Sequence, residues 1–119
     1  MDTTITRRRS QRLFLQVRVV VQGVLPTGTP FSEETHTIVV NAHGALVEME
    51  TPLEPGQIVT LRNVRTNEQI ECATKLVKPV DPKKFSTAFE FKVPGPDFWR
   101  ISFPPDDWSA KPAEPKKNP

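Results

Sequence analysis

The sequence predicts an all-β protein, a single domain that forms a six-stranded antiparallel barrel. Apolar and polar residues alternate with a period of two along most of the chain, whereas helical periodicity is almost absent. Turn residues separate the alternating segments. An open sheet of this size would leave two edges exposed, so we expect the sheet to close into a barrel. A chain of 119 residues is long enough to build one core.

The first strand is predicted from Leu13 to Val21. Its odd-numbered apolar residues from Leu15 onward share one face, and Gln16 and Arg18 point the other way. One face of this strand is therefore expected in the core and the other in solvent.

Five more strands follow, separated by connections rich in Gly, Pro, Asn and Asp. In the second strand Thr37 and Val39 share a face, and in the sixth strand Phe89, Phe91 and Val93 share a face. The five strands are expected at residues 34–40, 45–50, 58–62, 69–77 and 85–93, with a tight turn at 41–44, a hairpin turn at 65–68 and a loop at 79–84.

Three further segments flank the predicted barrel at residues 13–93. Residues 1–12 are predicted to be a flexible basic arm, residues 94–108 an aromatic belt packed on the barrel, and residues 109–119 a disordered tail. Seven of the thirteen prolines lie from Pro94 onward, and the final stretch is polar and rich in Lys and Pro.

The belt is predicted from its large apolar side chains, which are too hydrophobic to remain in water. Pro96 and Asp97 can open one helical turn, after which two prolines prevent a longer helix. An aromatic belt also suits contact with a partner protein or self-association. The side chains concerned are Phe98, Trp99, Ile101, Phe103 and Trp108.

Composition excludes several classes of protein. The net charge is only +2, so the whole surface is not suited to polyanions, and no nucleic-acid polymer is expected as a partner. No apolar run approaches the roughly 20 residues that span a bilayer, and the pattern of a secretory signal is absent. The single cysteine, Cys72, excludes an internal disulfide and is expected as a small core residue in a reducing compartment. We therefore expect a cytoplasmic protein.

Catalysis has little support in the sequence. It contains no Gly-rich phosphate loop, no grouped metal ligands and no spacing typical of a Ser/His/Asp set. The two histidines, His36 and His43, have no thiol or grouped carboxylate beside them in the chain. We expect neither an enzyme nor a bound metal or cofactor.

A run of arginines directly precedes the first predicted strand. Four of the sixteen Lys and Arg residues lie between Arg7 and Arg12. Arginine presents a planar fork of donors that matches phosphate oxygens and the acceptor edge of guanine. The run therefore indicates either a site for an anionic nucleotide or a solvated or membrane-facing basic tail.

An Arg-rich stretch before the first strand, and a polar/Gly turn between the second and third strands of a six-stranded barrel, resemble the PilZ family. Members of that family are typically receptors for the bacterial second messenger cyclic di-GMP. The resemblance covers roughly Thr6 to Val93 and implies a PilZ-like barrel with no catalytic activity.

The first motif of the family is RxxxR, whose arginines hold the phosphates and the Hoogsteen edge of guanine. Arg8 and Arg12 match this spacing, and Arg7 and Arg9 are auxiliary candidates. A bidentate Arg–guanine contact contributes roughly 1–3 kcal/mol of discrimination.

The second motif, Asp/Asn-x-Ser-x-x-Gly, matches only in part. In an alignment without gaps, Gly44 is retained, Asn41 replaces the serine and Val39 occupies the leading position. In an alternative register, Asn41 is the first residue of the motif and His43 is equivalent to the serine. Val39 cannot accept hydrogen bonds from guanine. The resemblance implies ligand contacts from Asn41, His43 and Gly44, and a structural explanation stands beside it: Asn41 can bond its neighbouring backbone and Gly44 can adopt a positive φ.

The sequence therefore indicates a non-enzymatic bacterial signalling module that binds cyclic di-GMP, weakly because of Val39. The alternative is a degenerate PilZ-like adaptor that binds no nucleotide and acts by protein–protein contact, with the aromatic belt as one candidate surface.

Overall fold

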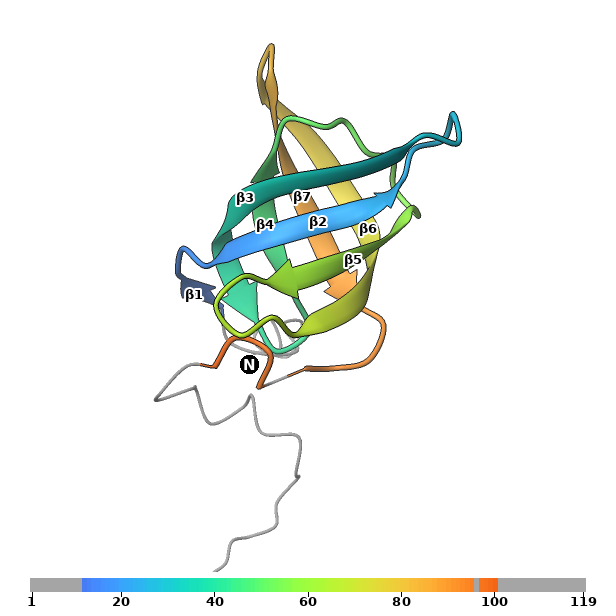
Figure 1. Ribbon diagram of the computed structural model, residues 1–119. Coiled ribbons are helices and arrows are strands. Elements are labelled where there is room, and N and C mark those ends of the chain that lie inside the picture. The colour runs from blue at the N-terminus through green and yellow to red at the C-terminus, as the bar shows by residue number, and fades with distance from the viewer. Residues whose placement is uncertain (1–11, 96, 101–119) are drawn as a thin grey trace, which may run out of the picture.

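The computed structural model describes residues 12–95 and 97–100, which form a closed antiparallel barrel with one additional strand (Figure 1). The barrel order is β3-β2-β5-β6-β7-β4, and β4 closes it by pairing with β3, while β1 adds to β3. The predicted all-β, six-stranded antiparallel barrel is confirmed. The strands are β1 (Leu13–Phe14), β2 (Arg18–Val24), β3 (Pro30–Asn41), β4 (Gly44–Met49), β5 (Ile58–Asn63), β6 (Gln69–Asp81) and β7 (Lys84–Phe91).

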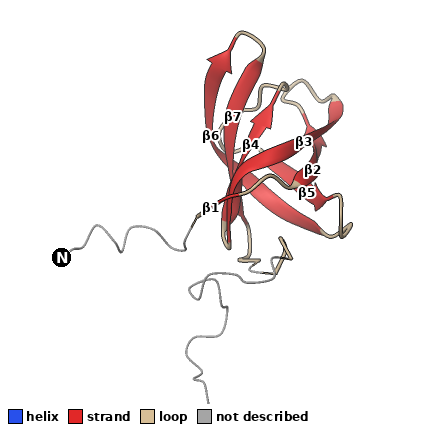
Figure 2. Cartoon of the chain, turned by 90° about the vertical axis from the view of Figure 1, so that its left-hand side faces the viewer, coloured by secondary structure: helices blue, strands red, loops and turns tan. Residues whose placement is uncertain are grey.

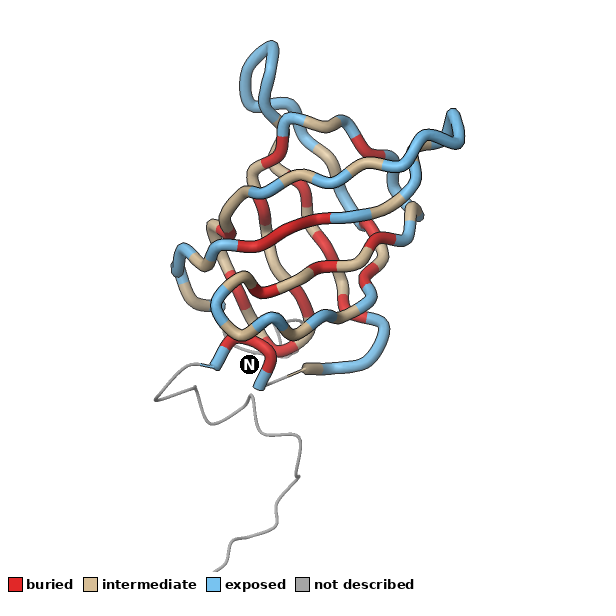
Figure 3. The backbone as a smooth tube through the Cα atoms, viewed as in Figure 1, coloured by how far each residue is buried: buried red, intermediate tan, exposed pale blue. Residues whose placement is uncertain are grey.

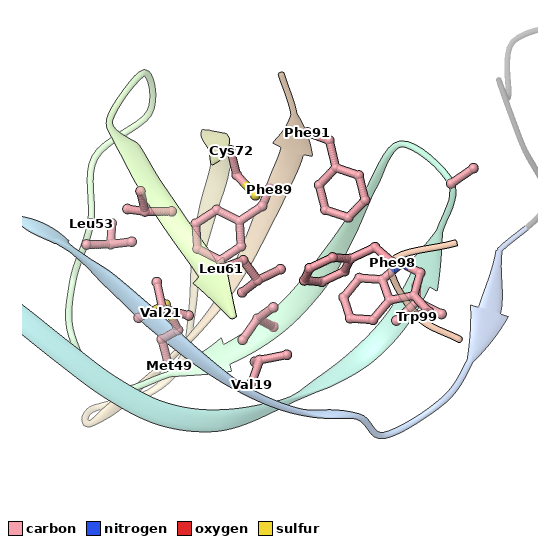
Figure 4. Packing of buried hydrophobic residues seen from close by; sticks show 14 residues of the cluster. Val19, Val21, Met49, Leu53, Leu61, Cys72, Phe89, Phe91, Phe98 and Trp99 are labelled. Atoms are coloured by element: carbon pink, nitrogen blue, oxygen red, sulfur yellow. The ribbon is translucent and has the colours of Figure 1, made fainter. Parts of the chain in front are cut away.

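Buried and exposed residues alternate along the strands (Figure 3), and most of the buried residues are apolar. Val19 and Val21 of β2, Leu61 of the neighbouring β5 and Phe89 of β7 belong to one continuous core (Figure 4). Burying a side chain of this size contributes about 1.5–3 kcal/mol relative to leaving it exposed. The barrel is thus a packed scaffold, and candidate sites lie on its outside.

The first predicted strand is broken into β1 and β2. Phe14 pairs with Val39 and Arg18 with His36, so three residues, 15–17, lie opposite two residues of β3. This extra residue is a β-bulge. The Thr37 hydroxyl bridges the break, because it accepts from the Val17 N–H at 2.9 Å and donates to the Leu15 carbonyl at 2.6 Å. The prediction of one uninterrupted strand was wrong.

A second irregularity lies on the other edge of β3. Thr37 pairs with Val47 and Val39 with Leu46, so Ile38 is an extra residue opposite β4. The inward face changes at this point, and Thr37 and Val40 are buried where Thr37 and Val39 were expected to share a face. This shift turns Val39 away from the core.

The hairpin of β6 and β7 is longer than predicted and projects beyond the rest of the barrel (Figure 2). Asp81 pairs with Lys84 across a two-residue turn, and Pro79 lies within β6 next to a register shift instead of ending the strand. β7 ends at Phe91, so Val93 is exposed and does not share the inner face as predicted.

Residues 97–100 close one end of the barrel. Phe98 and Trp99 are core residues, with ring centroids 4.9 Å apart, and Phe98 lies 5.6 Å from Phe91 (Figure 4). The Phe98 N–H donates to the Gly95 carbonyl and the Arg100 N–H to the Asp97 carbonyl, which forms turns where a helical turn was expected. The other belt residues, Ile101, Phe103 and Trp108, and the tail at 109–119 lie outside the described residues. Among the described residues, no helix is long and apolar enough to cross a membrane.

Candidate functional site

A groove of about 470 Å³ lies on the outer face of the barrel where β3, β4, β7 and β6 run side by side. We call it the first groove. Its floor is an apolar row in which neighbours pair across the strands: Val39 with Leu46, Leu46 with Ala88, and Ala88 with Leu76. The bulge at Ile38 places Val39 in this row. Such a floor can receive the flat face of a base.

The polar end of the first groove lies along the next row of the sheet. Asn41 pairs with Gly44, and Gly44 pairs with Glu90 of β7. Arg12, His43 and Lys75 line the same groove. Residues that are far apart in the sequence therefore meet around one hollow.

Four of the six predicted site residues line the first groove: Arg12, Asn41, His43 and Gly44. Arg8 and Arg9 lie outside the described residues. Arg12 is exposed, directly precedes β1 and lines the groove.

Asn41 holds the turn between β3 and β4. Its Oδ1 accepts from the His43 N–H at 2.8 Å, as expected for an asparagine that bonds its neighbouring backbone. Its carbonyl accepts from the Trp99 Nε1–H at 2.9 Å. The His43 carbonyl accepts from the Phe91 N–H at 2.7 Å. The turn is thus fixed to the barrel from two sides.

Gly44 is required for close packing of two strands. A Cβ at this position would lie 2.0 Å from the Phe89 carbonyl oxygen, a distance at which backbone must shift. The described glycines with positive φ are Gly28 and Gly56, so the expectation of a positive φ at Gly44 was wrong. The close approach of β4 to β7 explains the glycine instead.

Two residues of the first groove were missed by the sequence reasoning, Lys75 and Glu90. Their Nζ and Oε1 atoms are 3.4 Å apart, and both side chains are partly exposed. Alternation with Phe89 and Phe91 places Glu90 on the outer face of β7, which the sequence could have indicated. The position of Glu90 beside Gly44 depends on the pairing of β4 with β7, which residues near Glu90 in the sequence do not indicate.

A second groove, of about 560 Å³, is lined by residues 15–18 and by Val64, Arg65, Trp99 and Arg100. Its arginines bind other parts of the chain. Arg18 pairs with Glu34 and Arg100 with Glu68. Arg65 donates to the carbonyls of Trp99 and Arg100, each at 3.2 Å.

The described residues offer little catalytic chemistry. Burial, with a smaller contribution from Glu71, raises the pKa of the Cys72 thiol to about 12, so a thiolate does not form at neutral pH. No group of His, Cys, Asp and Glu suited to a metal ion occurs within residues 12–95 and 97–100.

No protein-family profile matches this chain, and no curated protein matches its sequence. Its structure is similar to that of the Bacillus subtilis Inhibitor of motility (MotI/DgrA), with a TM-score of 0.59 and 15% sequence identity. The similarity covers 79% of this chain and 46% of that one, so this chain spans less than half the length of that protein. A similarity at this level of identity shows the fold alone. It supports a PilZ-like fold, because the neighbour is a PilZ-domain protein.

Proposed function

We propose that the protein is a non-enzymatic signalling module that binds cyclic di-GMP in the first groove. One observation carries the proposal: Arg12 from the first motif region and the turn at 41–44 from the second line the same groove. The two regions are far apart in the sequence, and both correspond to motifs of the PilZ family.

The groove has the physical properties that a dinucleotide requires. Its volume of about 470 Å³ lies within the ordinary range for small-molecule sites. The apolar row of Val39, Leu46, Ala88 and Leu76 would receive a base face, and the guanidinium groups of Arg8 and Arg12, with Arg9 as an auxiliary, would hold phosphates and the guanine O6 and N7 atoms. Asn41, His43 and Gly44 would contact the ligand from the turn.

Two features lower the expected affinity. Val39 offers no hydrogen-bond acceptor to the base, and a polar reader replaced by an apolar one commonly weakens recognition. Ordering the arm over the ligand costs conformational entropy, which the arginine contacts must offset. The ordered arm would change the surface offered to a partner protein, which is how we expect a bacterial cytoplasmic module of this kind to signal.

Calorimetric titration with cyclic di-GMP at physiological salt tests the proposal. We expect binding by the wild type, and Arg8→Ala and Arg12→Ala should each weaken it by roughly 10- to 100-fold, the value of one bidentate guanine contact. Arg62→Ala is the matched control, because Arg62 lines neither groove and its side chain donates to Asn67 instead. Absence of heat up to high-micromolar ligand would contradict the receptor function. Unchanged affinity in both arginine variants would show that the ligand binds elsewhere.

A second candidate function is an adaptor that binds no nucleotide, and Val39 in the groove floor favours it. Phe98 and Trp99 are core residues, so a partner surface from the aromatic belt would have to come from its remaining residues. The same titration distinguishes the two functions, because an adaptor of this kind would give no heat with cyclic di-GMP.

A further inference from the structure

We propose that Glu90 selects guanine in the first groove, by accepting hydrogen bonds from the N1–H and N2–H groups of one base. This inference rests on the proposed function, since it concerns how the same groove reads its ligand. It assigns to β7 the acceptor that Val39 of β3 does not provide.

The position of Glu90 follows from the strand register. Glu90 lies between two buried residues, Phe89 and Phe91, so its side chain points to the outside of the barrel, where it lines the groove. Ala88 of the apolar floor lies two residues earlier on the same face. Successive rows on one face of a strand are roughly 7 Å apart, so a purine lying on the floor places one edge at the row of Glu90.

Gly44 lies in the middle of this row. It stands between Asn41 and Glu90 in the register, and the close approach of β4 to β7 at this glycine brings the two sides of the row together. The carboxylate of Glu90 and the polar turn therefore lie on either side of Gly44 at the end of the groove.

The ion pair between Lys75 and Glu90 is compatible with this role. The Nζ–Oε1 distance is 3.4 Å, and the side chains are 58% and 30% exposed. A pair this accessible to water contributes little to stability, so exchanging the Lys75 contact at Oε1 for a base edge costs little. Lys75 would then be available to a ligand phosphate, while the carboxylate remains in the groove.

A carboxylate distinguishes guanine from adenine by chemistry alone. Ionised Glu90 is acceptor-only, and the Watson–Crick edge of guanine presents two adjacent donors that fit its two oxygens. The corresponding edge of adenine presents one donor and the acceptor N1, which a carboxylate repels. A glutamine, with one acceptor and one donor, fits the adenine pattern instead.

The test is to titrate the wild type and Glu90→Gln with cyclic di-GMP and with cyclic di-AMP. We expect the wild type to prefer cyclic di-GMP, and Glu90→Gln to bind it about tenfold or more weakly while binding cyclic di-AMP better. Glu54→Gln is the matched control: it removes the same charge from an exposed residue that does not line the groove, and should leave both affinities unchanged. Lys75→Gln should weaken both dinucleotides to a similar extent.

The outcomes separate this inference from the proposed function. If the wild type binds no cyclic di-GMP, both are overturned. If the wild type binds it and Arg12→Ala weakens it, but Glu90→Gln keeps the wild-type ratio of the two affinities, only the role of Glu90 is overturned. Both affinities are measured on the same variant, so a loss of folded protein would lower them equally and leave their ratio unchanged. Glu90→Ala provides a second variant, which should lose the preference for guanine without a gain for adenine.

Discussion

The two grooves are similar in size, at about 470 and 560 Å³, but their charged groups have different roles. In the second groove Arg18, Arg65 and Arg100 all bind carboxylates or carbonyls of this chain. In the first groove the polar groups come from the turn at 41–44, from Arg12 and from a partly exposed ion pair. A cluster of arginines is therefore a poor guide to a ligand site when each guanidinium already holds another segment in place.

Trp99 connects the two grooves, and its replacement should have the largest effect. It lines the second groove, is 1% exposed, and donates from Nε1 to the Asn41 carbonyl in the first groove. Trp99→Ala should lower the free energy of unfolding by about 3–5 kcal/mol, measured by urea denaturation.

Trp99→Phe separates the two roles of this side chain. It keeps most of the packing but leaves the Asn41 carbonyl without its donor, which should cost about 1–2 kcal/mol of stability and also weaken nucleotide binding. If Trp99→Phe binds cyclic di-GMP as the wild type does, the two grooves are independent and Trp99 serves packing only.

Arg65 and Arg12 should show opposite behaviour when each is changed to Ala. Arg65→Ala removes the bonds to the Trp99 and Arg100 carbonyls and should lower the free energy of unfolding by about 1 kcal/mol, with nucleotide affinity unchanged. Arg12→Ala should lower the affinity and leave the unfolding midpoint unchanged. Thermal unfolding and titration of both variants test this contrast, and a loss of affinity in Arg65→Ala would show that the second groove takes part in binding.

Cys72 lines neither groove, so the pH dependence of its contribution to stability provides a background measurement. The pKa of its thiol rises from 9.0 to about 12 in the folded protein. The unfolded thiol ionises first, so this contribution to stability is complete below about pH 9 and is lost as the pH rises toward 12, by at most about 1.4 kcal/mol per pH unit. Urea denaturation near pH 8 and pH 10 should show a steeper loss for the wild type than for Cys72→Ala. Equal slopes would mean that the buried thiol ionises as easily as an exposed one.

The barrel could be predicted because its signals are local: alternation marks the strands and Gly, Pro and Asn mark the turns. The irregularities could not, because the bulges at 15–17 and at Ile38 depend on the register of neighbouring strands and on the Thr37 hydroxyl. The turn at 41–44 was predicted for the same local reason. Glu90 and Lys75 were missed because strand order alone brings them to that turn.

The shortness of β1 allows residues 13–15 to open separately from the rest of the barrel. β1 has two residues, and beyond it the Leu15 N–H donates to the Ile38 carbonyl at 3.2 Å. Few contacts hold residues 13–15 to β3, so their amide protons should exchange with solvent through local opening. The amide protons of the central barrel strands should exchange only through global unfolding. A ligand held by Arg12 would slow that opening. The exchange rate of the Leu15 amide would then fall when the groove is occupied, and the amides of the barrel strands would serve as an internal reference.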